Sequence, residues 1–120
     1  MTPIYENEFI KIEIEESEIP WIKIFTQEKR KELSDCTEEE QLELLRVLTI
    51  SEKLMLSFYK PKKINIASFG NYMPQVHWHL MARFEEDSYF PEPMWGEKRR
   101  EGTYQLERFD EFLKLLKNNL

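Results

Sequence analysis

The sequence lacks several features that would indicate particular classes of protein. It contains a single cysteine, Cys36, among 120 residues, and one cysteine cannot form an internal disulfide, which favours a reducing compartment. No stretch is long and apolar enough to span a bilayer. The first twelve residues mix acidic and apolar side chains, which is not the pattern of a signal peptide. We therefore expect a cytoplasmic protein with no membrane partner.

An excess of basic residues is also missing. Lysine and arginine number 17 against 23 aspartates and glutamates, which gives a formal net charge of −6. Non-specific binding to DNA or RNA usually requires a basic surface, so we expect no nucleic-acid partner. A small phosphate ligand remains compatible with this charge, because one local cluster of hydrogen-bond donors can bind it.

Apolar residues, by contrast, are plentiful. Hydrophobic residues make up 41% of the chain and aromatic ones 13%, which is enough for a folded core and argues against disorder. The length predicts one domain over residues 1–120. A lone chain this short buries a limited share of its surface, and dimerisation would bury more, so we expect a dimer.

The spacing of apolar residues predicts both strands and helices. Thr37 and Glu40 form a capping-box signature, and the apolar residues that follow recur at helical spacing until Pro61. A second helix is predicted near the C-terminus, and residues 85–102 read as a long irregular loop of a length that is often functional. The predicted strands cover residues 9–14, 19–25, 63–69 and 75–84, and the helices cover residues 38–59 and about 106–116.

The two histidines of the chain stand two residues apart on one predicted strand. Side chains at this spacing share a face, so the imidazoles of His77 and His79 should emerge side by side. Histidine can act as a nucleophile or as a proton carrier near neutral pH. In the preceding loop, Asn71 could offer amide donors to a phosphate, and Gly70 would permit close approach of the backbone.

Two other interpretations of the histidine pair stay open on the residues alone. The histidines could be ordinary surface residues. A His-x-His strand can also hold zinc, although carboxylates would have to complete such a site, since the chain has no other histidine.

Several motifs resemble the bacterial branch of the histidine-triad (HIT) family. They are residues 63–71 (KINIASFGN), 74–80 (PQVHWHL), 83–87 (RFEED) and 90–96 (FPEPMWG). The family pattern is His-φ-His-φ-His-φ-φ, where φ is apolar. Here Gln75 stands at the place of the first histidine, and His77 and His79 stand at the second and third. The loop before the long helix has no histidine, where many members have one.

This resemblance implies an α+β fold, with an antiparallel sheet, one long helix packed on it and a C-terminal helix. It also implies a homodimer that binds a small-molecule purine nucleotide. The implied reaction is hydrolysis or transfer at the α-phosphate of a phosphoramidate or a dinucleoside polyphosphate, through a nucleotidyl-histidine intermediate. No metal or cofactor is expected to take part.

The resemblance also assigns roles to particular residues. His77 would be the nucleophile, His79 would stabilise the phosphate oxygens or the leaving group, and Gln75 would orient its neighbours, because an amide takes up no proton near pH 7. Asn71 and nearby backbone N–H groups, at Gly70 among others, would hold the α-phosphate. Further candidates for the nucleotide cleft are Asn65 in its wall and Glu13 at the ribose hydroxyls.

The glutamine also motivates a second hypothesis, in which the protein is a catalytically weak nucleotide-binding or sensor module. Trp78 faces away from the histidines and is predicted to lie in the core. Trp95, in the trailing loop, could pack locally or reach a partner's cleft, and the sequence does not decide between these. Cys36 is interpreted as structural.

Overall fold

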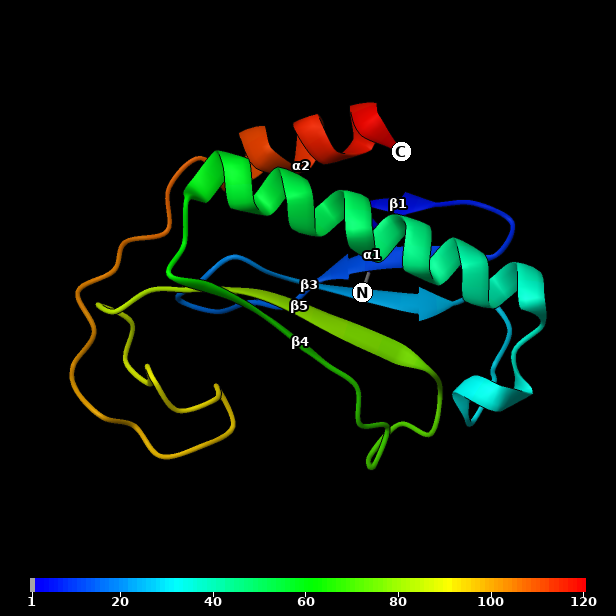
Figure 1. Ribbon diagram of the computed structural model, residues 1–120, viewed down its shortest axis with the longest axis horizontal. Helices are drawn as coiled ribbons and strands as arrows, with labels where there is room; N and C mark the ends of the chain where they lie inside the picture. The colour runs from blue at the N-terminus through cyan, green and yellow to red at the C-terminus, as the bar shows by residue number, and fades with distance from the viewer. Residues whose placement is uncertain (1) are drawn as a thin grey trace.

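The computed structural model describes residues 2–120 and shows an open antiparallel sheet with two helices over one of its faces (Figure 1). The sheet has five strands in the order β1-β2-β3-β5-β4, and each neighbouring pair is antiparallel. No helix in this part of the chain combines the length and apolar character needed to cross a membrane. The strands are β1 (Tyr5–Glu6), β2 (Ile10–Ile14), β3 (Trp21–Thr26), β4 (Lys63–Ala67) and β5 (His77–Arg83), and the helices are α1 (Glu38–Tyr59) and α2 (Phe109–Asn119).

The predicted α+β class is confirmed, but some element ends differ from the prediction. Strand β5 begins at His77 and excludes Gln75, whose backbone N–H instead bonds Met73 in a tight turn after Asn71. The side-chain amide of Gln75 also donates to the carbonyl of Thr26 at 2.7 Å, which holds this residue outside the strand. Helix α2 begins at Phe109, after Arg108 in a left-handed conformation with φ of 58°.

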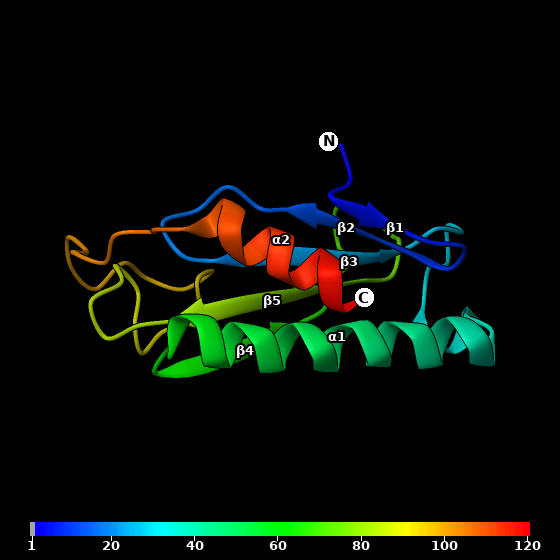
Figure 2. The ribbon, with the colours of Figure 1, turned by 90° about the horizontal axis from the view of Figure 1, so that it is seen from above.

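The core lies between the helices and one face of the sheet. Ile12, Ile24 and Trp78 are cross-strand neighbours on this face, and Trp78 packs against the core as predicted. Figure 2 shows α1 and α2 side by side above the sheet. Fully or almost fully buried residues from all layers complete this core, among them Ile10, Ile22, Leu44, Val47, Met55, Leu80, Phe112 and Leu116. The opposite face of the sheet is therefore left free of helices.

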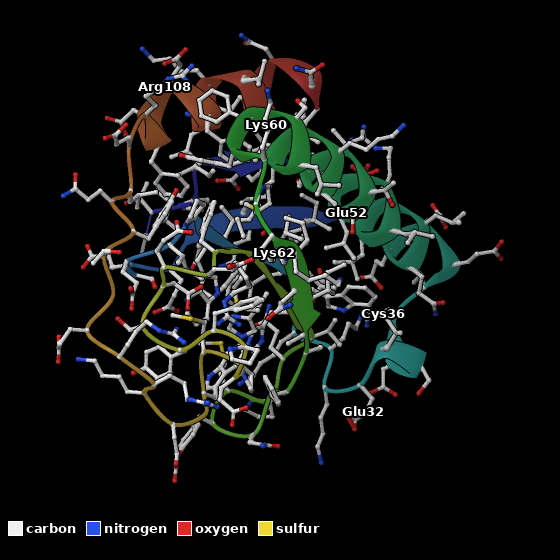
Figure 3. The ribbon with its side chains drawn as sticks, turned by 60° about the vertical axis from the view of Figure 1, so that its left-hand side comes forward. Glu32, Cys36, Glu52, Lys60, Lys62 and Arg108 are labelled. Carbon is white, nitrogen blue, oxygen red and sulfur yellow. The ribbon has the colours of Figure 1, made fainter. Side chains whose placement is uncertain are left out.

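Helix α1 begins with the predicted capping box. The Thr37 hydroxyl accepts a hydrogen bond from the Glu40 N–H at 3.1 Å, and the Glu40 carboxylate accepts one from the Thr37 N–H at 2.6 Å. Glu40 also pairs with the Arg30 guanidinium at 3.1 Å, and the Arg30 carbonyl accepts the N–H of Val76 at 2.7 Å. The start of α1 is thus joined through Arg30 to the chain just before β5. Cys36 lies buried between this helix and the short 3-10 turn at residues 33–35 (Figure 3).

Candidate active site

The two histidines lie on the face of the sheet opposite the helices. Strand β5 pairs with β3 so that His77 faces Phe25 and His79 faces Lys23. The centroids of the two imidazole rings are 5.1 Å apart. The predicted side-by-side arrangement of the histidines is therefore present.

A cavity of about 430 Å³ opens over this part of the sheet. That volume falls within the roughly 300–1,000 Å³ typical of small-molecule sites. Its floor comes from β3 and β5, and its walls come from the loop after β4 and from Trp95. The lining residues are Glu15, Lys23, Phe25, Phe69, Gly70, Asn71, Tyr72, Met73, His77, His79 and Trp95.

His77 is held so that one ring nitrogen remains free. Its Nδ1 lies 2.8 Å from the backbone carbonyl of Gln75, and a carbonyl only accepts, so Nδ1 carries the hydrogen. The neutral imidazole then has its lone pair on Nε2. The ring stacks on Phe25 with centroids 4.9 Å apart. This contact therefore leaves Nε2 as the ring nitrogen that can act as a nucleophile.

His79 is more deeply buried than His77 and has a different partner. Only 8% of its surface is exposed, and its Nδ1 accepts a hydrogen bond of 3.0 Å from the indole Nε1 of Trp21. Burial, followed by the nearby His77 and Lys23, lowers the pKa of His79 to about 4, although Glu15 acts in the opposite direction. At neutral pH His79 is uncharged.

Trp95 packs against His79 of its own chain. Its ring packs edge-on against His79, Trp21 and Phe69, with centroids 4.9, 5.3 and 4.8 Å apart. About half of its surface is exposed, at 49%. Trp95, whose packing the sequence did not decide, thus forms part of the cavity wall.

The structure brings some of the expected site residues together and separates others. His77, His79, Asn71 and Gly70 all line the cavity. The Gln75 side chain does not: its amide donates to the carbonyl of Thr26 at 2.7 Å. Gln75 contributes to the site through its backbone carbonyl on His77.

Two of the residues expected to contact the nucleotide do not line the cavity. Asn65 lies in the middle of β4 opposite Met81, and its side-chain oxygen accepts a hydrogen bond from Arg83 at 2.9 Å. Glu13 is buried on the sheet and pairs with Lys11 at 3.4 Å. Neither residue lines the cavity. The acidic residue that does is Glu15, which is paired with Lys23 at 3.1 Å.

Sequence reasoning missed the contribution of strand β3. Trp21, Lys23 and Phe25 alternate along this strand and share the face of the histidines. That alternation was visible in the sequence, but the pairing of β3 with β5 was not. In residues 2–120, no cluster of three or more histidine, cysteine or acidic side chains could hold a metal ion.

Comparison with known proteins identifies the family of this chain. The model of the HIT domain matches residues 13–86, a span that includes both histidines and most of the sheet. The chain belongs to the HIT domain family. No curated protein sequence matches it.

Solved structures with the HIT fold superpose over almost the whole chain. A histidine triad protein from Sinorhizobium meliloti is 27% identical with a TM-score of 0.78, covering 98% of this chain and 88% of its own. One from Bradyrhizobium japonicum is 24% identical with a TM-score of 0.80 and the same coverage. The diadenosine triphosphate hydrolase of Plasmodium falciparum is 18% identical with a TM-score of 0.58, covering 98% of this chain and 74% of its own.

Proposed function

We propose that this HIT protein is a nucleotide hydrolase or transferase that acts at the α-phosphate of a nucleoside phosphate derivative. The observation that carries the proposal is His77, whose Nε2 is free because the Gln75 carbonyl holds Nδ1. This nitrogen belongs to a residue of the cavity floor. The substrate would be a purine nucleotide joined to its leaving group as a phosphoramidate or a dinucleoside polyphosphate.

In the proposed reaction the Nε2 of His77 attacks the α-phosphorus and displaces the leaving group. The nucleotidyl-histidine is then cleaved by water, which divides one difficult step into two easier ones. Asn71 and the backbone at Gly70 lie on the cavity wall, where N–H donors would stabilise the phosphate oxygens. The φ of 79° at Gly70 suits a residue without a side chain.

Gln75, at the place of the first histidine of the triad, acts here through its backbone. Its side chain is directed toward Thr26, so it positions the turn before β5. This mechanism calls for no metal to generate its nucleophile, because a side-chain nitrogen attacks in place of a metal-bound water. We also propose that the protein works in the cytoplasm, where its lone, buried Cys36 stays reduced.

The proposal includes a homodimer. Strand β4 is one of the two edges of the sheet and carries the exposed Ile66. Helix α1 runs along the same side of the molecule (Figure 2) and carries the exposed Leu42, Leu45 and Leu56. An exposed edge strand beside an apolar helix face is suited to pairing with a second copy. Light scattering that shows only monomer at working concentration would contradict this part of the proposal.

The test of the function measures AMP release from diadenosine triphosphate and from adenosine phosphoramidate, in the presence of a chelator. The natural chain should release AMP from at least one of these two substrates, and His77→Ala should lower that rate by about 1,000-fold or more. Circular dichroism and chemical denaturation check that the variant folds. Unchanged release by folded His77→Ala would refute the role of His77, and release that requires a metal would refute the metal-free reaction.

A second candidate function is nucleotide binding without useful turnover, as in a sensor. It is favoured by the position of the Gln75 side chain, which is directed away from the cavity and leaves two imidazoles at the site. Calorimetric binding of AMP, combined with no cleavage of any substrate in the panel, would support this alternative over the enzyme.

A further inference from the structure

The hydrogen bond between Trp21 and His79 fixes which ring nitrogen of His79 carries its hydrogen. An indole N–H can only donate, so the Nδ1 that lies 3.0 Å from it must offer its lone pair. The neutral imidazole then carries its hydrogen on Nε2. Both side chains are buried, each with 8% of its surface exposed, so water competes little for this bond.

The surroundings of His79 keep it uncharged. The ionisable groups that face it are His77 on the same strand, Lys23 on β3 and Glu15 after β2, and the other contacts are the rings of Trp95 and Phe69. Burial, then His77 and Lys23, lower its pKa to about 4. Protonation of Nδ1 would also break the bond from Trp21.

A neutral imidazole in this state can stabilise charge but cannot move a proton at neutral pH. It can donate a hydrogen bond from Nε2 to a phosphate oxygen. Giving up that hydrogen would create an imidazolate, and taking one up at Nδ1 is opposed by Trp21. The hydrogen on Nδ1 of His77 is held by the Gln75 carbonyl at 2.8 Å. The Gln75 amide is directed to Thr26 and has no proton to transfer near pH 7.

We propose that Trp21 is a positioning residue that holds His79 as a hydrogen-bond donor only, and that the site therefore selects nucleotides whose leaving group departs as a stable anion. Such substrates join the nucleoside monophosphate through an anhydride oxygen to a phosphate, sulfate or carboxylate. Phosphoramidates with alkylamine leaving groups, which need a proton to depart, would be poor substrates. This inference rests on the proposed function and narrows its substrate class.

The steps balance without an acid. The lone pair on Nε2 of His77 forms a bond to the α-phosphorus, and the bond from phosphorus to the anhydride oxygen breaks with its electron pair on that oxygen. Water then attacks the phosphorus, its proton passes to solvent, and the P–N bond breaks with its electron pair returning to Nε2. The products are the nucleoside monophosphate and the free acid anion.

Within the described residues, Lys23 is the cavity group that could still supply a proton. Its ammonium is held by Glu15 at 3.1 Å and is largely buried, with 17% of the side chain exposed. Tyr72 lies at the rim and is fully exposed. The experiment must therefore distinguish Lys23 from a reaction with no acid.

The first measurement uses aryl esters of adenosine 5′-phosphate whose phenols differ in acidity. We expect kcat/KM to fall by about tenfold for each unit by which the pKa of the phenol rises, because the full negative charge stays on the departing oxygen. The Lys23→Met variant should keep this slope. If kcat/KM of the natural chain depends only weakly on the pKa of the phenol, the proposal is wrong. If this dependence becomes steep only in Lys23→Met, Lys23 is the acid.

The second measurement compares Trp21→Phe with Trp78→Phe, which lies on the opposite face of the sheet. Nitrogen-15 NMR of the natural chain at pH 7 should show Nδ1 of His79 without hydrogen and Nε2 with it. In Trp21→Phe, His79 should take up a proton at a higher pH than in the natural chain, and kcat/KM should depend less steeply on the pKa of the phenol. Trp78→Phe should change neither. If Trp21→Phe also changes neither, Trp21 does not fix His79 and the proposal is wrong.

The two measurements separate this inference from the proposed function. Release of AMP with a shallow slope leaves the hydrolase standing and overturns the leaving-group selection. If AMP is not released even from the ester of the most acidic phenol, both the hydrolase and the leaving-group selection are wrong. The nitrogen-15 spectra then still decide whether Trp21 fixes the tautomer of His79.

Discussion

Arg83 and Asp87 form a two-point ion pair in which both side chains are almost completely buried. Their atoms lie 3.0 Å apart at Nε–Oδ2 and 3.1 Å apart at Nη2–Oδ1, with 2% and 0% of the side chains exposed. Arg83 also donates to the carbonyl of Glu92 at 2.7 Å. This pair joins the end of the histidine strand to the loop that carries Trp95 across the cavity.

We predict that Asp87→Asn destabilises the protein by about 3–5 kcal/mol, because it leaves a buried guanidinium without its counter-charge. Urea denaturation followed by circular dichroism measures the change. The matched control is Glu111→Gln, which removes the partner of Arg108 in an ion pair that is more than half exposed and should leave the midpoint unchanged. Equal midpoints for natural chain and Asp87→Asn would contradict the role given to the pair.

The carboxylate of Asp87 should also make the protein less stable in acid. Burial alone would raise the pKa of Asp87, but hydrogen bonds from Arg83 and from the N–H groups of Phe84, Tyr89 and Phe90 hold it below its ordinary value of 3.8. As the pH falls from 3.8 toward the lower pKa that Asp87 has in the folded protein, the unfolded chain binds the proton first. The free energy of unfolding therefore decreases.

Denaturation midpoints measured at a series of pH values should therefore decline below the ordinary pKa of an aspartate. The decline should be smaller in Asp87→Asn, which has no proton to take up at this position. An identical acid profile in both proteins would show that other carboxylates cause the decline.

The titration of His79 should respond to the charges on either side of it. We predict that His79 stays neutral down to about pH 5, because its pKa is lowered to about 4. Lys23→Met removes a positive charge and should raise the pKa of His79, whereas Glu15→Gln removes a negative one and should lower it. Proton NMR of the imidazole Cε1–H measures both shifts. Shifts of the same sign in the two variants would contradict this account.

Trp95 should contribute to nucleotide affinity as part of the cavity wall. We predict that Trp95→Ala weakens AMP binding by about 1 kcal/mol, or roughly fivefold in Kd, through the loss of aromatic contact area. Isothermal titration calorimetry measures it, with Glu97→Gln as a control, since Glu97 is exposed in the same loop and does not line the cavity. Equal affinities for natural chain and Trp95→Ala would place the nucleotide elsewhere.

The elements of the fold were predictable where local chemistry decides them. The capping box of Thr37 and Glu40 and the period-two alternation of the strands depend on residues close in sequence, and the structure agrees with both. The shift of Gln75 out of β5 was missed, because the late start of this strand depends on a long-range contact, the amide of Gln75 on the carbonyl of Thr26.

The candidate site was predictable in part for the same reason. His77, His79, Gly70 and Asn71 lie close together in the sequence, and they do meet at the cavity. Asn65 stays outside the cavity lining because its side chain bonds the buried Arg83. Glu13 stays outside it because its carboxylate pairs with Lys11. The contributions of Trp21 and Trp95 depend on strand pairing and loop closure over long stretches of chain.

The link through Arg30 has a consequence for how the protein opens. Its guanidinium holds Glu40 in the capping box, and its carbonyl holds the N–H of Val76. The first turn of α1 and the segment leading into β5 therefore share one anchor, although they are far apart in sequence. In hydrogen-exchange terms, the amides of Glu40 and Val76 should become accessible in the same opening event, so that fraying of the helix start and loosening of the chain before His77 form one cooperative unit.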